Sequence, residues 1–295
     1  MSSTSSEFAR PRDITVTSAR SRFQWGGPVA TGLLVAWTAL AVLPLLWMVS
    51  TSLKQPDQIF TYPPQFIPTP LYFEHYAKVI ARTPFPRFFF NSTLVGICVA
   101  VGQLLSSAMA AYAFARLSFR GRDTLFVVFL GTLMLPDQVT YIPLFIVAKY
   151  ANLVDSYAGL ILPAVVTPFG IFLLRQAFLG VPRELEEAAF IDGCGPWQTL
   201  WRILLPVVKP ALAVTTLFAF LHSWNAYFWP LIVTQSTAMR TLPVALRYFL
   251  TDSDLGTDWG ALMAASTLVL APVIGLFLAL QKQFVAGLLS GSLKG

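Results

Sequence analysis

The chain has 295 residues, of which 56% are hydrophobic and 12% are charged, and its formal net charge is +6. An average soluble domain has about 25% charged residues, so this composition excludes an ordinary water-soluble fold and indicates a protein that folds in a lipid bilayer. The two cysteines, Cys98 in an apolar run and Cys194 in a polar loop, lie far apart in the sequence. We therefore expect neither a disulfide nor a metal site from them.

Six apolar runs in the sequence are candidates for membrane spans. A helix needs about 20 apolar residues to cross a hydrocarbon core of about 30 Å. The runs are long and continuous, which favours helices over short alternating strands. The first run is too long for a cleaved signal peptide and should remain as an anchor. The sequence thus predicts an all-α integral membrane protein with six transmembrane helices, at about residues 28–50, 88–115, 124–148, 156–175, 210–233 and 259–281.

The distribution of basic residues predicts the orientation of these spans. Thirteen of the twenty Lys and Arg residues fall on the side of the two termini. Because basic residues are enriched in cytoplasmic loops, both termini should be cytoplasmic in a multi-pass protein of the cell membrane. A transmembrane domain of residues 25–281 then lies between cytoplasmic tails of residues 1–24 and 282–295.

Two loops are expected on the opposite, outer side of the membrane. Residues 54–87 contain seven prolines, which favours extended or turn-rich structure. Residues 234–258 end in an acidic cluster of Asp252, Asp254 and Asp258. We expect neither loop to form a separate domain.

The cytoplasmic loop of residues 181–206 has the pattern of a helix–turn–helix. Pro182 suits the first turn of a helix, and three glutamates follow it, where the positive end of the helix dipole favours acids. Asp192-Gly193 should end this helix, because glycine adopts the left-handed conformation that closes a helix. A second helix is predicted by an apolar stripe at helical spacing, formed by Trp197, Leu200, Trp201 and Leu204. Small residues and exposed acids are typical of an element that docks a partner protein.

The same loop carries a resemblance to a known family. Glu187-Ala188-Ala189 is followed by Gly193, Ile203, Leu205 and Pro206, at offsets of 6, 16, 18 and 19 residues from the glutamate. This pattern resembles the signature loop of permease subunits of binding-protein-dependent ABC importers. Other residues resemble the carbohydrate branch of that family, specifically the smaller permease of the maltose-type pair. They are Leu135-Pro136, Pro143, Asp155-Ser156-Tyr157, Trp224-Asn225, Pro230-Leu231, Thr241-Leu242-Pro243 and the tail 281–295.

The resemblance implies a type I ABC importer permease fold with a cytoplasmic coupling loop. It further implies a heterodimer with a second permease subunit, two ATP-binding subunits that hydrolyse ATP, and an extracytoplasmic solute-binding protein. The expected solute is a small sugar or sugar-like molecule, with glycerol 3-phosphate or its diesters as the alternative. The coupling residues implied are Glu187, Ala188, Ala189, Asp192, Gly193, Ile203, Leu205 and Pro206.

Other classes of function are disfavoured by missing motifs. The chain has no Gly-Lys-Ser or Gly-Lys-Thr phosphate loop and no common hydrolase motif, and it has two histidines, His75 and His222. We therefore expect no catalytic residue, no cofactor, no metal site and no nucleic-acid partner. An ion-coupled secondary transporter would need no docking loop and often shows inverted repeats, which are not evident here. An intramembrane enzyme is the remaining rival.

Three polar residues within the predicted spans are candidates for the solute path. Asp137 either lines a path or caps a helix that begins after Pro136. Asn225 either bonds a sugar hydroxyl, with Trp224 or Tyr227 stacked on the ring, or ties helices together, and we favour the structural role.

Overall fold

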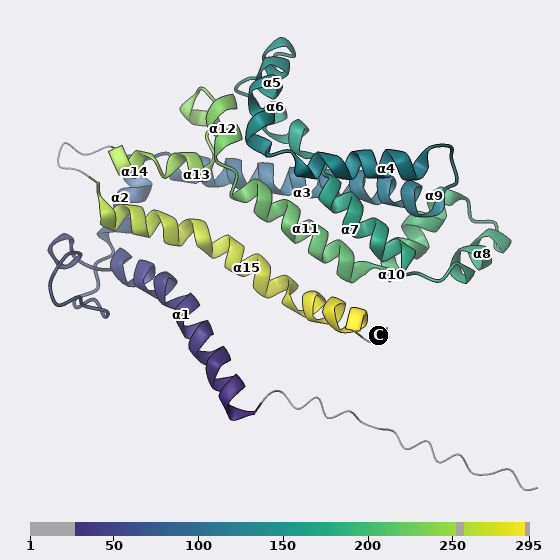
Figure 1. The fold of residues 1–295 in the computed structure, drawn as a ribbon. Helices are drawn as coiled ribbons and strands as arrows, with labels where there is room; N and C mark the ends of the chain where they lie inside the picture. The colour runs from purple at the N-terminus through teal and green to yellow at the C-terminus, as the bar shows by residue number, and fades with distance from the viewer. Residues whose placement is uncertain (1–26, 252–256, 293–295) are drawn as a thin grey trace, which may run out of the picture. The chain divides into compact units, whose positions relative to one another are not determined.

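The structure is a computed structural model, in which residues 27–251 and 257–292 are described. Every regular element in these two ranges is helical (Figure 1), in agreement with the predicted class. One compact unit ends at Leu46 and a second begins at Trp47. The boundary falls within α1 (Pro28–Ser52), an apolar helix of 25 residues. At 1.5 Å per residue it is about 37 Å long, enough to cross a bilayer.

Three helices are individually long and apolar enough to span a membrane. Besides α1, they are α3 (Phe85–Arg116) and the first part of α15 (Trp259–Ser292), up to Gln281. These agree with three of the six predicted spans. The helix α15 continues for another eleven residues, so most of the region expected as a cytoplasmic tail is helical. Residues 293–295 of that tail lie outside the described residues.

The other predicted spans consist of shorter helices separated by breaks, a shape that the apolar runs did not specify. The helix α4 (Arg122–Gly131), extended by η2 (Thr132–Met134), meets α5 (Asp137–Tyr150) at 102°. The helix α6 (Tyr157–Ile161), extended by η3 (Leu162–Ala164), meets α7 (Pro168–Leu179) at 44°. The fifth predicted span, residues 210–233, is divided into α11 (Lys209–Trp224) and α12 (Phe228–Val233). The third bent pair of apolar helices is Pro196–Val207 with α11, at 87°, and up to six spans result in the described residues when each bent pair is counted as one.

Proline causes the first of these breaks. Pro136 directly precedes α5, and Leu135 before it has the extended conformation, with φ −84° and ψ 122°. A proline ring disfavours helical geometry in the preceding residue, so the helix stops at Met134 and a new one begins after the proline. Pro168 likewise begins α7 after the extended Thr167.

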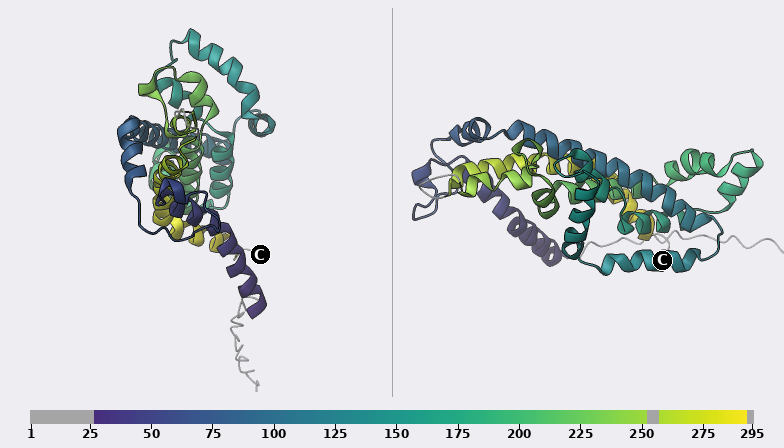
Figure 2. Two further views of the ribbon diagram at one scale, coloured as in Figure 1. Left: turned by 90° about the vertical axis from the view of Figure 1, so that its left-hand side faces the viewer. Right: turned by 90° about the horizontal axis from the view of Figure 1, so that it is seen from above.

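The second compact unit is built around α3. This helix packs against α7 and α11, and α11 packs in turn against α15 (Figures 1 and 2). Glycine allows a close approach at one of these contacts, because a Cβ on Gly96 would lie 2.9 Å from the Phe220 ring. Trp224 is buried between α11 and α15, and its indole Nε1 donates a hydrogen bond to the Val269 carbonyl at 3.2 Å.

One end of this unit carries the predicted outer loops. Between α1 and α3 lie η1 (Pro56–Gln58) and α2 (Glu74–Arg82). The expectation of a segment without regular helix was therefore wrong for its proline-free stretch, where α2 forms. His75 on α2 is buried, and its Nε2 bonds the Lys54 carbonyl at 2.9 Å. Burial lowers the pKa of His75 and that of Lys54, whose amine lies 3.8 Å from the Trp47 ring centroid.

The second outer loop is fixed to α3 by a buried amide. Asn91 Nδ2 donates to the carbonyls of Ala238 and Arg240, each at 2.8 Å, and Asn91 Oδ1 accepts from the Tyr157 hydroxyl at 2.7 Å. All these atoms are bonded because unpaired polar groups are costly to bury. The segment so held contains η5 (Thr237–Met239), α13 (Leu242–Ala245) and α14 (Tyr248–Thr251).

Asp155 secures the same loop from the other side. Its Oδ1 accepts the backbone N–H groups of Gln235 at 2.9 Å and Ser236 at 3.0 Å. Burial raises the pKa of Asp155, but the hydrogen bonds from Ser236 and Gln235 outweigh burial and lower the pKa below its ordinary value. The outer loop therefore has a defined attachment at both of its sides.

Candidate functional site: a docking loop at the end of the bundle

The loop predicted to dock a partner lies at the opposite end of the bundle from α2, α13 and α14 (Figures 1 and 2). Its first helix, α8 (Glu184–Ile191), has three glutamates in the first turn, as the helix dipole favours. It ends as predicted, because Gly193 has a φ of +82°. The Cys194 N–H bonds the Ala189 carbonyl at 2.9 Å, and the Gly193 N–H bonds the Phe190 carbonyl at 3.1 Å. These two bonds define a Schellman motif with Asp192 as the C-cap.

The second predicted helix of the loop is present but irregular. It consists of α9 (Pro196–Gln198), the π-helical segment η4 (Thr199–Leu204) and α10 (Leu205–Val207). It meets α11 at an angle of 87°. Leu200 and Leu204 are buried as the apolar stripe predicted, whereas Trp197 is exposed and Trp201 is half-buried.

Buried side chains attach this second helix to the ends of α3 and α7. The leucines at 200, 204 and 205 pack into one apolar cluster with Tyr112 and Ala115 of α3 and with Leu174 and Phe178 of α7. In contrast, α8 leaves most of its surface free. Ile191 is 86% exposed, and Leu185 and Phe190 are also exposed. The loop therefore combines an anchored half with an apolar half that is open to a partner.

The eight predicted coupling residues are divided between these halves. The exposed ones are Glu187, Ala188, Asp192, Gly193 and Pro206. Ala189 and Leu205 are buried, and Ile203 is half-buried. A Cβ added to Gly193 would meet no atom within 4 Å, so the backbone alone requires glycine there.

A buried ion pair at the base of α8 was missed in the sequence. Arg116, the last residue of α3, contacts Glu186 with 2.6 Å between Nε and Oε1, and the side chains are 6% and 9% exposed. Arg116 Nη2 also donates to the carbonyls of Phe178 and Val181 at 2.6 Å each. In the sequence, Arg116 served only as one of the basic residues that predict the orientation of the spans. The signal was the helical spacing of Glu186 and Ala189, which places both on the buried side of α8.

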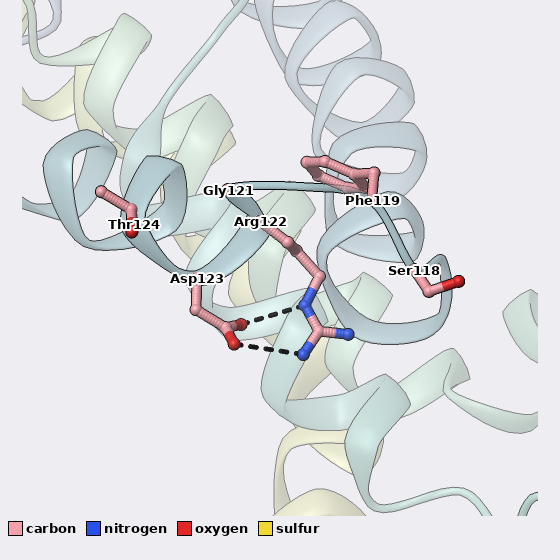
Figure 3. Close-up of a pocket in the computed structure, with 6 residues that line it drawn as sticks. All are labelled: Ser118, Phe119, Gly121, Arg122, Asp123 and Thr124. Carbon is pink, nitrogen blue, oxygen red and sulfur yellow. Dashed lines mark hydrogen bonds and ion pairs between the residues drawn. The ribbon is translucent and has the colours of Figure 1, made fainter.

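A shallow pocket lies in the turn between α3 and α4, formed by Ser118, Phe119, Gly121, Arg122, Asp123 and Thr124 (Figure 3). Arg122 and Asp123 form an ion pair across it, with 2.9 Å between Nε and Oδ1. Arg122 is half-buried and Asp123 is exposed, and none of the predicted site residues lines the pocket. We assign it no role in binding.

The three candidate path residues lie at breaks between helices. Asp137 is the first residue of α5 and is exposed, Asn225 ends α11 and is exposed, and Tyr227 precedes α12 and is half-buried. Within the described ranges, none of the three side chains hydrogen-bonds another. They share a location at which the helical backbone is interrupted, as is common where irregular backbone borders a cavity in a membrane protein.

Neighbouring polar groups in α11 have local partners. The hydroxyls of Thr215 and Thr216 donate to the carbonyls of Ala211 and Leu212 in their own helix. Trp224 is buried in the core and is not available to stack on a sugar ring. In the part of the chain that the structure describes, no group of three or more His, Cys, Asp and Glu side chains is placed to hold a metal.

The apolar helices of this chain are those expected of a membrane permease. The family described as the binding-protein-dependent transport system inner membrane component matches residues 102–289. The chain belongs to this family of membrane subunits of transport systems.

Relatives and a solved structure agree with this assignment. The chain is 36% identical to the arabinooligosaccharides transport system permease protein AraQ of Halalkalibacterium halodurans, over 87% of this chain and 92% of the relative. It is 33% identical to the sn-glycerol-3-phosphate transport system permease protein UgpE of Yersinia enterocolitica, over 87% and 93%. Its fold matches a chain of a bacterial ABC transporter that imports the acidic polysaccharide alginate. That match has a TM-score of 0.78 and 25% identity, and covers 87% of this chain and 95% of the other.

Proposed function

We propose that the chain forms half of the solute path of an ATP-driven importer for a sugar or a sugar-like solute. The observation that carries the proposal is the near full-length similarity to AraQ, whose name specifies arabinooligosaccharides. The fold match to an alginate importer also points to a saccharide. The family match over residues 102–289 includes the breaks at the candidate path residues and the docking loop.

A glycerol 3-phosphate permease is the second candidate, because UgpE is similar over almost the same length. A phosphate group would need a basic partner along the path. Arg175 of α7 does not supply one, since its Nε donates to the Phe114 carbonyl at 3.3 Å and its guanidinium lies 4.1 Å from the Phe126 ring centroid. This arrangement favours an uncharged solute.

The docking loop would receive an ATP-binding subunit. A short helix with exposed Leu185, Phe190 and Ile191 is an apolar surface with few neighbours in the single chain. Exposed Glu187 beside exposed Ala188 would add a polar contact without hindering close approach. We propose that two such ATP-binding subunits serve a heterodimer of this chain with a second permease. A solute-binding protein would dock at the opposite end, on the loop held by Asn91 and Asp155.

Charge supports an orientation in which the docking loop is cytoplasmic. The turn between α3 and α4 contains Arg116, Arg120 and Arg122, and Arg116 contacts α8 directly. Basic residues are enriched on the cytoplasmic side, so this end of the bundle should face the cytoplasm. Six spans then place both termini there. Within the spans, we propose that Asp137, Asn225 and Tyr227 border the solute path.

The test is transport by the complete complex in proteoliposomes. The chain would be purified with its companion permease, ATP-binding subunit and solute-binding protein, and supplied with labelled neutral oligosaccharides or labelled glycerol 3-phosphate. We expect import of a neutral oligosaccharide that requires ATP hydrolysis and the binding protein. Import of glycerol 3-phosphate alone would establish the second candidate. Import driven by an ion gradient without ATP would contradict both.

A further inference from the structure

A charged side chain, that of Arg116, lies among apolar residues at the base of the docking loop. The side chain of Arg116 lies beside the apolar cluster that joins α3, α7 and the second loop helix, yet it is 6% exposed. Taking a guanidinium and a carboxylate out of water is unfavourable unless their contacts are nearly complete. The other ion pair within the described residues, Arg122 with Asp123, avoids most of that penalty because its side chains are 31% and 72% exposed.

The contacts of Arg116 join three separate elements. Arg116 itself ends α3, Phe178 lies in the last turn of α7, Val181 begins the docking loop, and Glu186 lies in α8. One guanidinium therefore contacts the last turn of α7 and the start of the docking loop through one carbonyl each at 2.6 Å, and α8 through a carboxylate at 2.6 Å. We call Arg116, Glu186 and these two carbonyls the Arg116 clamp. The C-terminal end of a helix favours a cation, which explains the positive charge beside the Phe178 carbonyl in the last turn of α7.

The position of the clamp matters because it is the direct polar link from α8 to α3, whereas the helix otherwise packs against η4. Ala189 is buried on the same side of the helix, whereas Leu185, Phe190 and Ile191 face outward. Short stretches of chain connect α8 to α7 and to α9. A displacement of α8 by a docked partner would therefore reach α3 and α7 by two routes, directly through Arg116 and indirectly through η4, which α8 contacts and which the apolar cluster anchors. The planar guanidinium suits this role, since its donors have fixed relative directions and a lysine amine cannot make the same set of bonds.

We propose that Arg116 is a positioning residue that transmits movement of the docking loop to α3 and α7 during transport. This inference rests on the proposed function, because it assumes that an ATP-binding subunit moves α8. It differs from a docking role, since neither Arg116 nor Glu186 is exposed to a partner. Loss of the clamp should leave the ATP-binding subunit bound but should lower the amount of solute imported per ATP hydrolysed.

The test compares Glu186→Gln, Arg116→Lys and Arg116→Gln in the complete complex, with Arg122→Gln as the control at the exposed ion pair. Three quantities are measured: the amount of ATP-binding subunit that co-purifies, the stimulation of ATP hydrolysis by the solute-binding protein, and the solute imported per ATP hydrolysed. Glu186→Gln should retain the ATP-binding subunit and lower the import per ATP by about 5-fold or more, within the ordinary range of coupling between sites. Arg116→Lys should fall between wild type and Arg116→Gln, and the control should match wild type.

The outcomes separate this inference from the proposed function. If Glu186→Gln imports as much solute per ATP as wild type, the Arg116 clamp is not a transmitting element. If its transport falls only in proportion to the ATP-binding subunit lost, the clamp is merely structural and the inference is also refuted. If the wild-type chain itself retains no ATP-binding subunit, the proposed function fails first and removes the basis of the inference.

Discussion

The left-handed turn after α8 allows a sharp test of the docking loop. Gly193 has a φ of +82°, a conformation that costs a residue with a Cβ about 1–2 kcal/mol, and a β-branched residue is especially unsuited to it. A Cβ there meets no atom within 4 Å, so the whole effect of Gly193→Val comes from the backbone. If the turn relaxes instead, the two bonds of the Schellman motif are lost.

This free energy translates into a measurable loss of docking. At about 1.4 kcal/mol per factor of ten, a cost of about 1–2 kcal/mol lowers the population of the native turn, and hence the affinity for an ATP-binding subunit, by about 5- to 30-fold. Thermal unfolding of the purified chain should change little, because Gly193 is exposed and distant from the packed cores. The assay is titration of the ATP-binding subunit onto the detergent-solubilised permease pair, combined with vesicle transport.

The same loop supplies a matched control at Gly195. This glycine is also exposed and free of neighbours within 4 Å, but its φ is −77° and its ψ is 169°, which suits valine. Gly195→Val should therefore bind the ATP-binding subunit as wild type does. Gly193→Asn should be intermediate, because asparagine tolerates the left-handed region. Equal affinity of the Gly193 and Gly195 valine variants would refute the assignment of this turn as a docking element.

Three further predictions concern acidic residues. Glu187→Ala should weaken the docking by about 1 kcal/mol or less, as for an isolated exposed polar contact, measured in the same titration. Asp155→Asn should lower the thermal stability at pH 7. Hydrogen bonding depresses the folded-state pKa of Asp155, so the stability that its carboxylate contributes is present above the unfolded-state pKa and is lost as the pH falls through the folded-state pKa. The thermal unfolding curves of wild type and variant should therefore converge in acid. Neutralising Asp252 and Asp254 should weaken stimulation by the solute-binding protein most at low salt, and stimulation that is equal at all ionic strengths would show that these acids are not at the interface.

Asp258, the third member of that acidic cluster, is best kept intact in this experiment. Its Oδ1 accepts the N–H of Ala261 at 3.0 Å in the first turn of α15. Replacing it would remove a helix cap, which typically costs about 1 kcal/mol and would obscure an effect on the partner. The other two members lie outside the described residues, so the sequence remains the basis of their assignment.

The apolar runs predicted the helices better than the shapes of the spans. Hydropathy depends on composition, which is the same for one straight helix and for two helices that meet at 102°. Pro136 was the local signal of that break, and it was noted in the sequence only as one of two explanations for Asp137. The structure establishes the break but gives Asp137 no side-chain cap bond, so its role in the solute path stays a prediction.

The docking loop shows why a motif can be recognised before its geometry is known. Its small and turn-forming residues, such as Ala188 and Gly193, are set by local geometry, so they appear in the sequence as a motif with fixed spacing. The Arg116 clamp leaves no such motif, because Arg116 and Glu186 are 70 positions apart and meet only after α3 and α7 pack together. A loop that must dock and also move its helices needs both parts. The exposed half can be recognised from local sequence, whereas the connection to the spans depends on tertiary contacts, and this is where the sequence alone was insufficient.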